Sequence, residues 1–583
     1  MQSEHFIAGK DASLESSIST MQGKLEGLGF QVEERSWLNP VDGIWSVHVR
    51  DRDCPLMFTN GKGATKLAAQ ASALGEYFER LSCNYFWNHY YLGEQYAEGG
   101  LAEGGRGFVH YPQEQWFQPG ANGEWPQGLL TAELQAFYNP RGNIHASSLV
   151  DFNSGNAEHG ICAIPYVRMR DEEVVHFPVN VIGNLYVSNG MSAGNTPAEA
   201  RTQALSEIFE RHIKFRIISE GLCLPDVPEA VIARYPGIAA GIAGLRAAGF
   251  GILVKDASLG GKYPVMNVTL LNPRDQGCYS SFGAHPRFEI ALERALTELL
   301  QGRALDALDG FPEPGFDLEE IASAPNIEIH FVDSSGIISW NFLGTEPDFE
   351  FVDWNFGTTT AEDYAWSVDA IHGAGHDIYV SDFKHLGVYA CRILVPGMSE
   401  IYPIDELEWE NNSVANDIRE DILHLPDLDD DECGDLLDTL NDSGIADERL
   451  VAALIGLAPG DDPFWLDLRV GELKTLLGLA IGDDDAIAEG CEWIRHFEQI
   501  NADRRRVYRC IEGLMKLYDA EADDGSRYDS ALETLYGTVT LHRAAALLDG
   551  EERFFGVPAL GLNLEGSDMH QRLLAGYGKL HRN

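Results

Sequence analysis

The sequence predicts a mixed α/β (α+β) domain that is followed by an all-α domain of helical hairpins. In the first ~415 residues, short strand-like runs alternate with segments of helical period, and from about residue 450 the strand signals fade. A chain of 583 residues is long enough for more than one domain. We therefore expect a first domain at 1–415 and a second at 416–583, which begins with an acidic linker.

The expected elements of the first domain follow one another along the chain. Strands are expected at 44–50, 177–187, 251–256, 263–271, 327–333, 377–383 and 388–395. Helices are expected at 11–28, 64–84, 197–219, 286–304 and 360–374. The GKGATK segment at 61–66 offers Thr65 as a helix N-cap and glycines whose N–H groups could approach an anion.

The second domain is expected to consist of paired amphipathic helices. They are predicted at 464–481, 484–500, 503–519, 527–537, 539–549 and 568–581. Their spacing is tetratricopeptide-like, and a plain helical bundle is equally compatible with it. The acidic run at 425–438 superficially resembles a calcium loop, but Glu432 occupies the position where such a loop needs glycine. A solvated linker or a helix end is the better interpretation of that run.

Composition excludes several classes of function. The net charge of −49 argues against direct binding to nucleic acid or to anionic membranes, and it is typical of a salt-adapted host. No apolar run is long enough to span a bilayer, and the N-terminus has no signal-peptide pattern. Nine dispersed cysteines without a CxxC pair indicate reduced thiols, and they argue against an iron–sulfur or structural zinc site. We expect a cytoplasmic protein.

One phrase recurs three times in the predicted helices. It reads ALGEYFER at 73–80, ALSEIFER at 204–211 and, more loosely, ALTELLQG at 295–302. Glutamates three residues apart share one helix face. The copies place five carboxylates in related positions, namely Glu76, Glu79, Glu207, Glu210 and Glu298. This arrangement suggests a metal site.

Exposed ion pairs are the alternative, because glutamate followed four residues later by arginine is a common surface pairing. A solvated face has no reason to repeat the whole phrase, so we favour the metal site. Magnesium prefers carboxylate oxygens together with substrate phosphates, which would make an ATP site without a P-loop. Arg80, Arg211 and Arg294 are candidates for phosphate contacts. A metal-dependent hydrolase is a weaker alternative, because few histidines lie near these motifs.

The GKG turn, SALGEYFER, NTPAEARTQALSEIFER and RALTELLQGR together resemble the YcaO family over about 60–400. The resemblance implies a fold peculiar to that family, in which ATP and magnesium bind between glutamate-bearing helices. It implies activation of a peptide amide by phosphorylation of its oxygen. The five glutamates would then bind magnesium. The ATP contacts would be Lys10, Ser17, Ser192, Asn195, Glu199, Gln203, Arg211 and Arg294. Beyond this cluster no catalytic residue is assigned.

The C-terminus departs from the azoline-forming members of the family. It ends LLAGYGKLHRN without their PxPxP tail, and a helical region takes its place. The resemblance to stand-alone members implies a homodimer that is accessory to β-methylthiolation of an aspartate in the twelfth small-subunit ribosomal protein. Its partner would be a RimO-type radical-SAM methylthiotransferase. The alternative is a non-catalytic ATP-binding adaptor, which recruits a modifying enzyme through its helical C-terminus.

Overall fold

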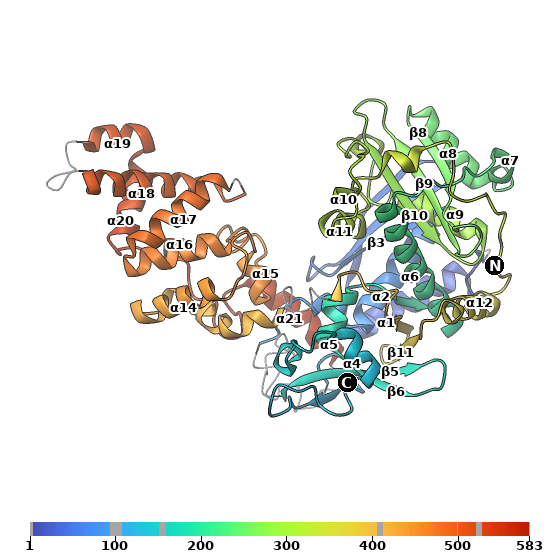
Figure 1. Cartoon of the computed structure of the whole chain (residues 1–583), viewed down its shortest axis with the longest axis horizontal. Coiled ribbons are helices and arrows are strands. Elements are labelled where there is room, and N and C mark those ends of the chain that lie inside the picture. Colours follow the sequence, from blue (N-terminus) through green and yellow to red (C-terminus); the bar gives the residue numbers. More distant parts are fainter. Residues whose placement is uncertain are drawn as a thin grey trace.

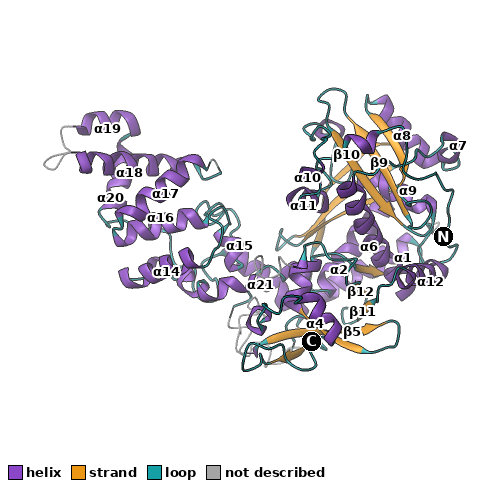
Figure 2. Cartoon of the chain, viewed as in Figure 1, coloured by secondary structure: helices purple, strands orange, loops and turns teal. Residues whose placement is uncertain are grey.

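The computed structural model describes residues 4–93, 108–150, 159–404, 412–497, 499–520 and 528–581. They form a broad body of sheets and helices and an elongated arm of helices that projects from one side of it (Figure 1). All the strands belong to the body, as Figure 2 shows by colour. No helix in the described ranges is long and apolar enough to cross a membrane. All nine cysteines are buried free thiols.

The strands of the body form three sheets, and all their ladders are antiparallel. The first contains β1 (Val32–Val41), β2 (Ile44–Asp51) and β3 (Phe58–Gly63). The second contains β8 (Gly251–Asp256), β9 (Val265–Leu271) and β10 (Cys278–Ala284). The third contains β4 (Gln115–Phe117), β5 (Ile161–Arg168), β6 (Val174–Pro178), β7 (Met191–Gly194), β11 (Tyr379–Phe383) and β12 (Tyr389–Leu394).

Helices cover and connect these sheets. They are α1 (Leu14–Leu28), α2 (Lys66–Ser82), α4 (Ala132–Tyr138), α5 (Val179–Val181), α6 (Pro197–Glu220), α7 (Glu229–Ile232), α8 (Pro236–Ala247), α9 (Phe288–Glu298), α10 (Leu318–Ile321), α11 (Ala324–Val332) and α12 (Thr360–Gly373). Helix α6 is central, since it contacts β7, β10, β12 and α12. The predicted mixed fold class is confirmed.

Local sequence explains where the helices that carry the repeated phrase begin and end. Thr65 caps α2, as predicted, and Thr196 caps α6; each hydroxyl accepts a hydrogen bond from the third residue of the helix. Helix α9 ends at Glu298, six residues earlier than the predicted limit of 304. After Glu298 the chain continues in turns whose N–H groups bond to the carbonyl three residues earlier, and Gly302, with a φ of 72°, prevents the helix from continuing to 304.

Two predicted strands are wrong. In the segment 177–187 the strand ends at Pro178, which lacks an N–H for the ladder, and helical turns follow through Tyr186. The segment 327–333 belongs to helix α11, which has Pro325 in its first turn. Its buried residues are Asn326 and His330, so a polar helical face was mistaken for an alternating strand.

Among the residues that the structure describes, the arm contains helices and no strand beyond an isolated bridge between Leu450 and Arg469. The helices are α13 (Arg419–Leu423), α14 (Asp430–Asp442), α15 (Val451–Ile455), α16 (Val470–Ile481), α17 (Asp484–His496), α18 (Ala502–Ala520), α19 (Asp529–Tyr536) and α20 (Thr538–Leu548). Helices α16 and α17 approach so closely that a Cβ on Gly490 would stand 2.0 Å from Thr475 Oγ1. Tetratricopeptide-like pairing remains a prediction.

The acidic segment is not a solvated linker where the structure describes it. Asp429 and Glu432 form a capping box that starts α14, and Leu436 and Leu440 on that helix lie in the core of the arm. Residues 405–411 lie outside the described residues. The acidic side chains therefore serve as helix-start signals.

The last helix, α21 (Asp568–Leu580), returns from the arm to the body. Leu573 and Tyr577 belong to the core formed by α1, α2 and β2, and the Tyr577 hydroxyl donates to the Val109 carbonyl over 2.7 Å. The domain boundary at 415/416 remains a prediction. If it holds, α21 still packs with the first domain.

Candidate nucleotide and metal site

The three helices with the repeated phrase line one cavity of about 1290 Å³. Strands β3 and β7, helix α1 with the segment before it, and the end of α11 also contribute to its walls. Every residue predicted to bind magnesium or ATP lines this cavity: Lys10, Ser17, Glu76, Glu79, Ser192, Asn195, Glu199, Gln203, Glu207, Glu210, Arg211, Arg294 and Glu298. Residues separated by almost 300 positions in sequence therefore meet at one place.

The first glutamate of each copy is held by a cation of the chain. Arg80 Nη2 lies 2.8 Å from Glu76 Oε1, and Arg211 Nη2 lies 2.7 Å from Glu207 Oε1. The ion pairs expected for an exposed helix face are therefore present. Both pairs, however, are mostly shielded from solvent and face the cavity. Glu298 has no arginine four residues on, and its ion pair is with Lys62 of β3.

The side chains of the second glutamates, Glu79 and Glu210, have no hydrogen bond or ion pair with any residue that the structure describes. Loss of hydration raises the pKa of Glu79 well above its ordinary value, and the charge of Glu207 raises it further. The pKa of Glu207 is raised by the same loss of hydration, against the effect of Arg211. Arg80 and Arg211 lower the pKa of Glu79 but do not offset its rise, so the negative charge there is incompletely neutralised.

A second group of predicted residues forms a hydrogen-bonded chain at the start of α6. Glu199 is 3% exposed and accepts from Lys10 Nζ at 3.2 Å and from the Asp11 N–H at 2.9 Å. Asn195 donates to both oxygens of Glu199 and accepts from the Ser17 hydroxyl over 2.9 Å. This chain ties the N-terminal segment to α6.

Arginine side chains occupy the wall between α6 and α9. Arg294 donates to the Ala284 carbonyl over 2.8 Å and to the side chain of Gln203. Arg211 lies over the Phe331 ring at 4.4 Å, and its Nη1 is buried with no partner in the described part of the chain. A buried guanidinium nitrogen without an acceptor suits an anionic oxygen of a ligand.

These residues fit a divalent cation and a polyphosphate by their chemistry. Carboxylates without partners need a cation, and magnesium takes hard oxygen ligands from few carboxylates and from phosphates. Within the described ranges, no group of three or more His, Cys, Asp or Glu side chains converges on one point as a metal would require. The carboxylates do not converge because the first glutamate of each copy is paired with a different cation, namely Arg80, Arg211 or Lys62.

Three lining residues were missed by the sequence analysis. Lys62 was overlooked within a segment noted for its glycines and for Thr65, and the Cα positions of Gly61 and Gly63 pack against α2. That their N–H groups approach an anion remains a prediction. His285 accepts the Arg287 N–H at Nδ1, which leaves Nε2 as the protonated nitrogen beside Gly9. Gln301 donates to the Asn60 carbonyl over 2.6 Å. The glycine–lysine pair at Gly61, which repeats the pair at Gly9 and Lys10, was the signal for Lys62.

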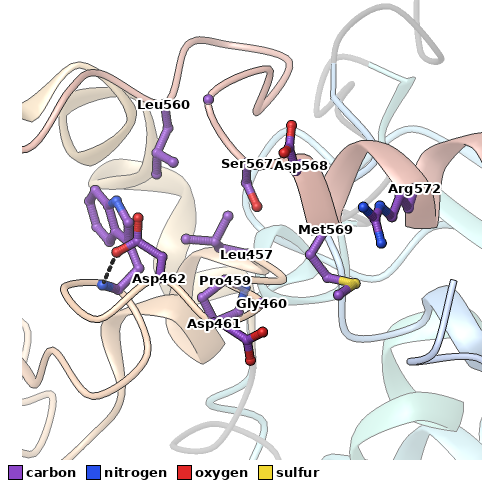
Figure 3. Close-up of a pocket in the computed structure, with 12 residues that line it drawn as sticks. Leu457, Pro459, Gly460, Asp461, Asp462, Leu560, Ser567, Asp568, Met569 and Arg572 are labelled. Carbon is purple, nitrogen blue, oxygen red and sulfur yellow. Dashed lines mark hydrogen bonds between the residues drawn. The ribbon is translucent and has the colours of Figure 1, made fainter.

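A smaller cavity of about 340 Å³ lies where the arm meets the start of α21 (Figure 3). Asp461, Asp462 and Asp568 are among the residues that line it. Asp462 Oδ1 accepts the N–H groups of Phe464 and Trp465, so it caps a turn. This cavity lacks the lysines, glutamates and glycine-rich strands of the larger one.

Comparison with known proteins identifies the family of the chain. A family model described as "YcaO cyclodehydratase, ATP- and Mg2+-binding" matches residues 60–399, and a model for the YcaO cyclodehydratase C-terminal domain matches 415–583. The chain is 49% identical to the Escherichia coli (strain K12) protein named ribosomal protein S12 methylthiotransferase accessory factor YcaO, over 99% of this chain and 98% of that protein. It is 47% identical to an uncharacterized Haemophilus influenzae protein, over 100% and 99%.

Solved structures show more distant similarity. A YcaO from Methanopyrus kandleri bound with AMPPCP and Mg2+ has a TM-score of 0.42 and 18% identity, over 69% of this chain and 96% of that one. A heterocyclase in complex with substrate and cofactor has the same TM-score and identity, over 67% of this chain and 53% of that one, about half its length. The family matches, which span more than half of the chain, decide the classification: the chain belongs to the YcaO family of ATP- and Mg2+-binding proteins.

Proposed function

We propose that this protein uses ATP and magnesium to phosphorylate the oxygen of an amide, as an accessory factor for β-methylthiolation of an aspartate in ribosomal protein S12. The observation that carries this proposal is the cavity in which five glutamates from three helices meet Lys10, Arg211 and Arg294. The name of the Escherichia coli relative, which aligns along almost the whole chain, supports the S12 pathway.

The chain's own residues have distinct roles in this proposal. The five glutamates hold magnesium, which when bound neutralises phosphate charge during transfer. Arg211 Nη1 and the Arg294 guanidinium meet phosphate oxygens, since one nitrogen is unpartnered and the other group is held rigidly by Gln203 and Ala284. The chain of Lys10, Ser17, Asn195 and Glu199 positions the remainder of the nucleotide.

The proposed reaction has two stages, transfer of a phosphoryl group to the amide oxygen and displacement of phosphate by a nucleophile. A bond forms between the amide oxygen and the γ-phosphorus of ATP, the bond from that phosphorus to the β–γ bridging oxygen breaks, and ADP leaves. A nucleophile then attacks the amide carbon and releases its proton to solvent. The bond between that carbon and the activated oxygen breaks, and the oxygen departs as part of inorganic phosphate. The acceptor amide and the nucleophile are the unassigned parts of the proposal.

The affinity of the full chain for ATP, measured by titration in the presence of magnesium, tests the proposed glutamate site. Glu76→Gln, Glu207→Gln and Glu210→Gln should each weaken ATP binding by about tenfold or more, because each removes a charge from the metal-binding set. Glu220→Gln is the matched control, since Glu220 ends the same helix α6, is paired with Arg216 and lies outside the cavity. Equal affinities in all four variants would exclude the glutamate site.

ATP turnover separates an enzyme from the adaptor. Wild type should form ADP when S12 and a RimO-type methylthiotransferase are present, and Glu207→Gln should not. If the amide oxygen of the acceptor is labelled with oxygen-18, the label should appear in the released phosphate. ATP binding without turnover under these conditions would favour the adaptor.

The adaptor has one observation in its favour. At the far end of the arm, Leu535 and Val539 are 75% and 83% exposed on the neighbouring helices α19 and α20. Single changes of these residues to aspartate should then abolish capture of the methylthiotransferase and leave ATP binding intact. Point variants are preferable to removal of 416–583, because that deletion also removes the core residues of α21.

We also propose that the protein is a cytoplasmic homodimer. Support comes from the family resemblance and from reduced-type cysteine usage. Sedimentation equilibrium of the full chain tests the dimer, and a mass of one chain at micromolar concentration would exclude it.

A further inference from the structure

The Gly-Lys-Gly sequence at 61–63 forms the end of strand β3, and its two glycines face helix α2. A Cβ on Gly61 would stand 2.0 Å from the Ala69 carbonyl oxygen, and one on Gly63 would stand 2.7 Å from the Ala68 Cβ. Because successive side chains of a strand point to opposite faces, Lys62 faces away from α2. It lines the cavity and forms an ion pair with Glu298.

The pattern of ion pairs shows why a lysine is needed there. In the first two copies of the repeated phrase, the arginine four residues after the first glutamate is its counter-ion. In the third copy that position is Gly302, which lies beyond the end of α9 and has a φ of 72°. Lys62 supplies from a strand the positive charge that α9 does not provide for Glu298.

The position of Lys62 is fixed by neighbours on both sides. Gln301 donates to the carbonyl of Asn60, and the Gly302 N–H donates to Ser46 Oγ over 3.2 Å. These bonds join the end of α9 to β2 and β3. The lysine and Glu298 therefore meet because the two backbones are tied together, and a flexible surface pair has no such constraint.

We propose that Lys62 is a further ligand-binding residue of this site, which neutralises Glu298 in the metal-free protein and, once magnesium takes Glu298, binds the nucleotide phosphates. This inference rests on the proposed nucleotide and metal site. A metal ion alone must displace the ammonium from Glu298 and leave it without a partner. With ATP present the displaced ammonium gains phosphate oxygens, so metal and nucleotide bind with positive coupling.

The test measures binding of Mn2+ alone, by electron paramagnetic resonance, and then of Mn2+ with ATP. Lys62→Met should bind Mn2+ alone about tenfold more tightly than wild type, because a competing positive charge is gone. Its ATP affinity at saturating Mn2+ should fall by a similar factor. Because the coupling between two ligands is reciprocal, both changes report the same loss of coupling, which is about tenfold when the ATP affinity without metal is unchanged. Lys62→Arg should keep most of the coupling, since it preserves the charge.

Lys66→Met is the matched control. Lys66 lies four residues along the chain, is exposed and stacks on Trp37 at 4.5 Å outside the cavity. It should leave both affinities unchanged. The metal-free melting temperature of each variant, with Lys62→Gln as a second neutral substitution, establishes that the proteins are folded.

The outcomes separate the two proposals. If wild type binds Mn2+ and ATP together and Lys62→Met leaves the Mn2+ affinity unchanged, the role of Lys62 is wrong and the site stands. If wild type binds neither Mn2+ nor ATP, the site is wrong and the role of Lys62 falls with it. Tighter metal binding and weaker ATP binding in Lys62→Met, with neither effect in Lys66→Met, would establish the proposal.

Discussion

Two regions of this molecule bury glutamates beside arginines, and they differ in how completely the charges are paired. In the arm, Glu472 is fully buried and accepts two hydrogen bonds from Arg504, at 2.7 and 3.0 Å, and one from the Tyr508 hydroxyl at 2.9 Å. Arg504 also donates to Asp467 and to the Pro463 carbonyl. Both carboxylate oxygens and all three nitrogens of the guanidinium have partners.

In the cavity of the body, the charged side chains are incompletely paired. Glu79 and Glu210 have no hydrogen-bonding partner in the described part, and Arg211 keeps one buried nitrogen unpaired. Burial raises the pKa of both Glu472 and Glu79, but Arg504 counteracts the rise at Glu472, and the charge of Glu207 adds to it at Glu79. A completed cluster stabilises a fold, and an incomplete one indicates a place for a ligand.

The largest expected effect breaks the completed cluster. Glu472→Ala leaves the buried Arg504 with Asp467 as its remaining counter-ion and removes the acceptor of the Tyr508 hydroxyl, which should lower the free energy of unfolding by about 3–5 kcal/mol. Urea denaturation followed by circular dichroism measures this value. A loss below about 1 kcal/mol would mean that the arm cluster contributes little more than an exposed pair.

The corresponding substitution in the cavity should not lower the free energy of unfolding. Glu79→Gln removes a charge that no neighbour compensates, so the metal-free protein should be as stable as wild type or more stable. ATP binding with magnesium should nevertheless weaken by about tenfold or more. A destabilised Glu79→Gln with unchanged ATP affinity would identify Glu79 as a structural residue.

Ligand binding should stabilise one region selectively. At a hundred times its dissociation constant, ATP with magnesium should add about 2.7 kcal/mol to the free energy of unfolding. Hydrogen exchange should slow in α2, α6 and α9, and the α16–α18 helices of the arm should be unaffected. Uniform slowing along the chain, or none, would contradict the assigned site.

The smallest expected effect is a pH dependence of the metal-free protein. The pKa of Glu79 is higher in the folded state than in the unfolded state, so over the interval between the two values folded molecules hold a proton that unfolded ones have lost. Stability is therefore lost as pH rises through that interval. Urea denaturation in EDTA at low and neutral pH should show wild type losing stability relative to Glu79→Gln, and parallel pH profiles would refute this.

Local signals predicted the helices of the site well. Thr65 and Thr196 cap the helices that carry the first two copies of the repeated phrase. The i, i+3 spacing placed Glu76 with Glu79 and Glu207 with Glu210 on shared faces because helix geometry is local. Their roles as ligands stay predictions.

Contacts between segments far apart in the sequence could not be predicted from local patterns. The pairing of Lys62 with Glu298 depends on the tie between β3 and the end of α9, which no short segment encodes. The return of Tyr577 to the core of the body is also a long-range contact. Helix α11 was mistaken for a strand because its face toward the core carries the polar residue Asn326.

The most direct test of the central claim is a crystal structure of the full chain with Mn2+ and a non-hydrolysable ATP analogue, with anomalous data at the manganese edge. The account predicts manganese peaks among Glu76, Glu79, Glu207, Glu210 and Glu298, at about 2.1–2.2 Å from carboxylate oxygens, slightly longer than for magnesium. Phosphates should lie near Arg211 and Arg294. Manganese peaks only elsewhere, for example at the acidic cavity of Asp461 and Asp568, with the glutamates still paired to Arg80, Arg211 and Lys62, would contradict it.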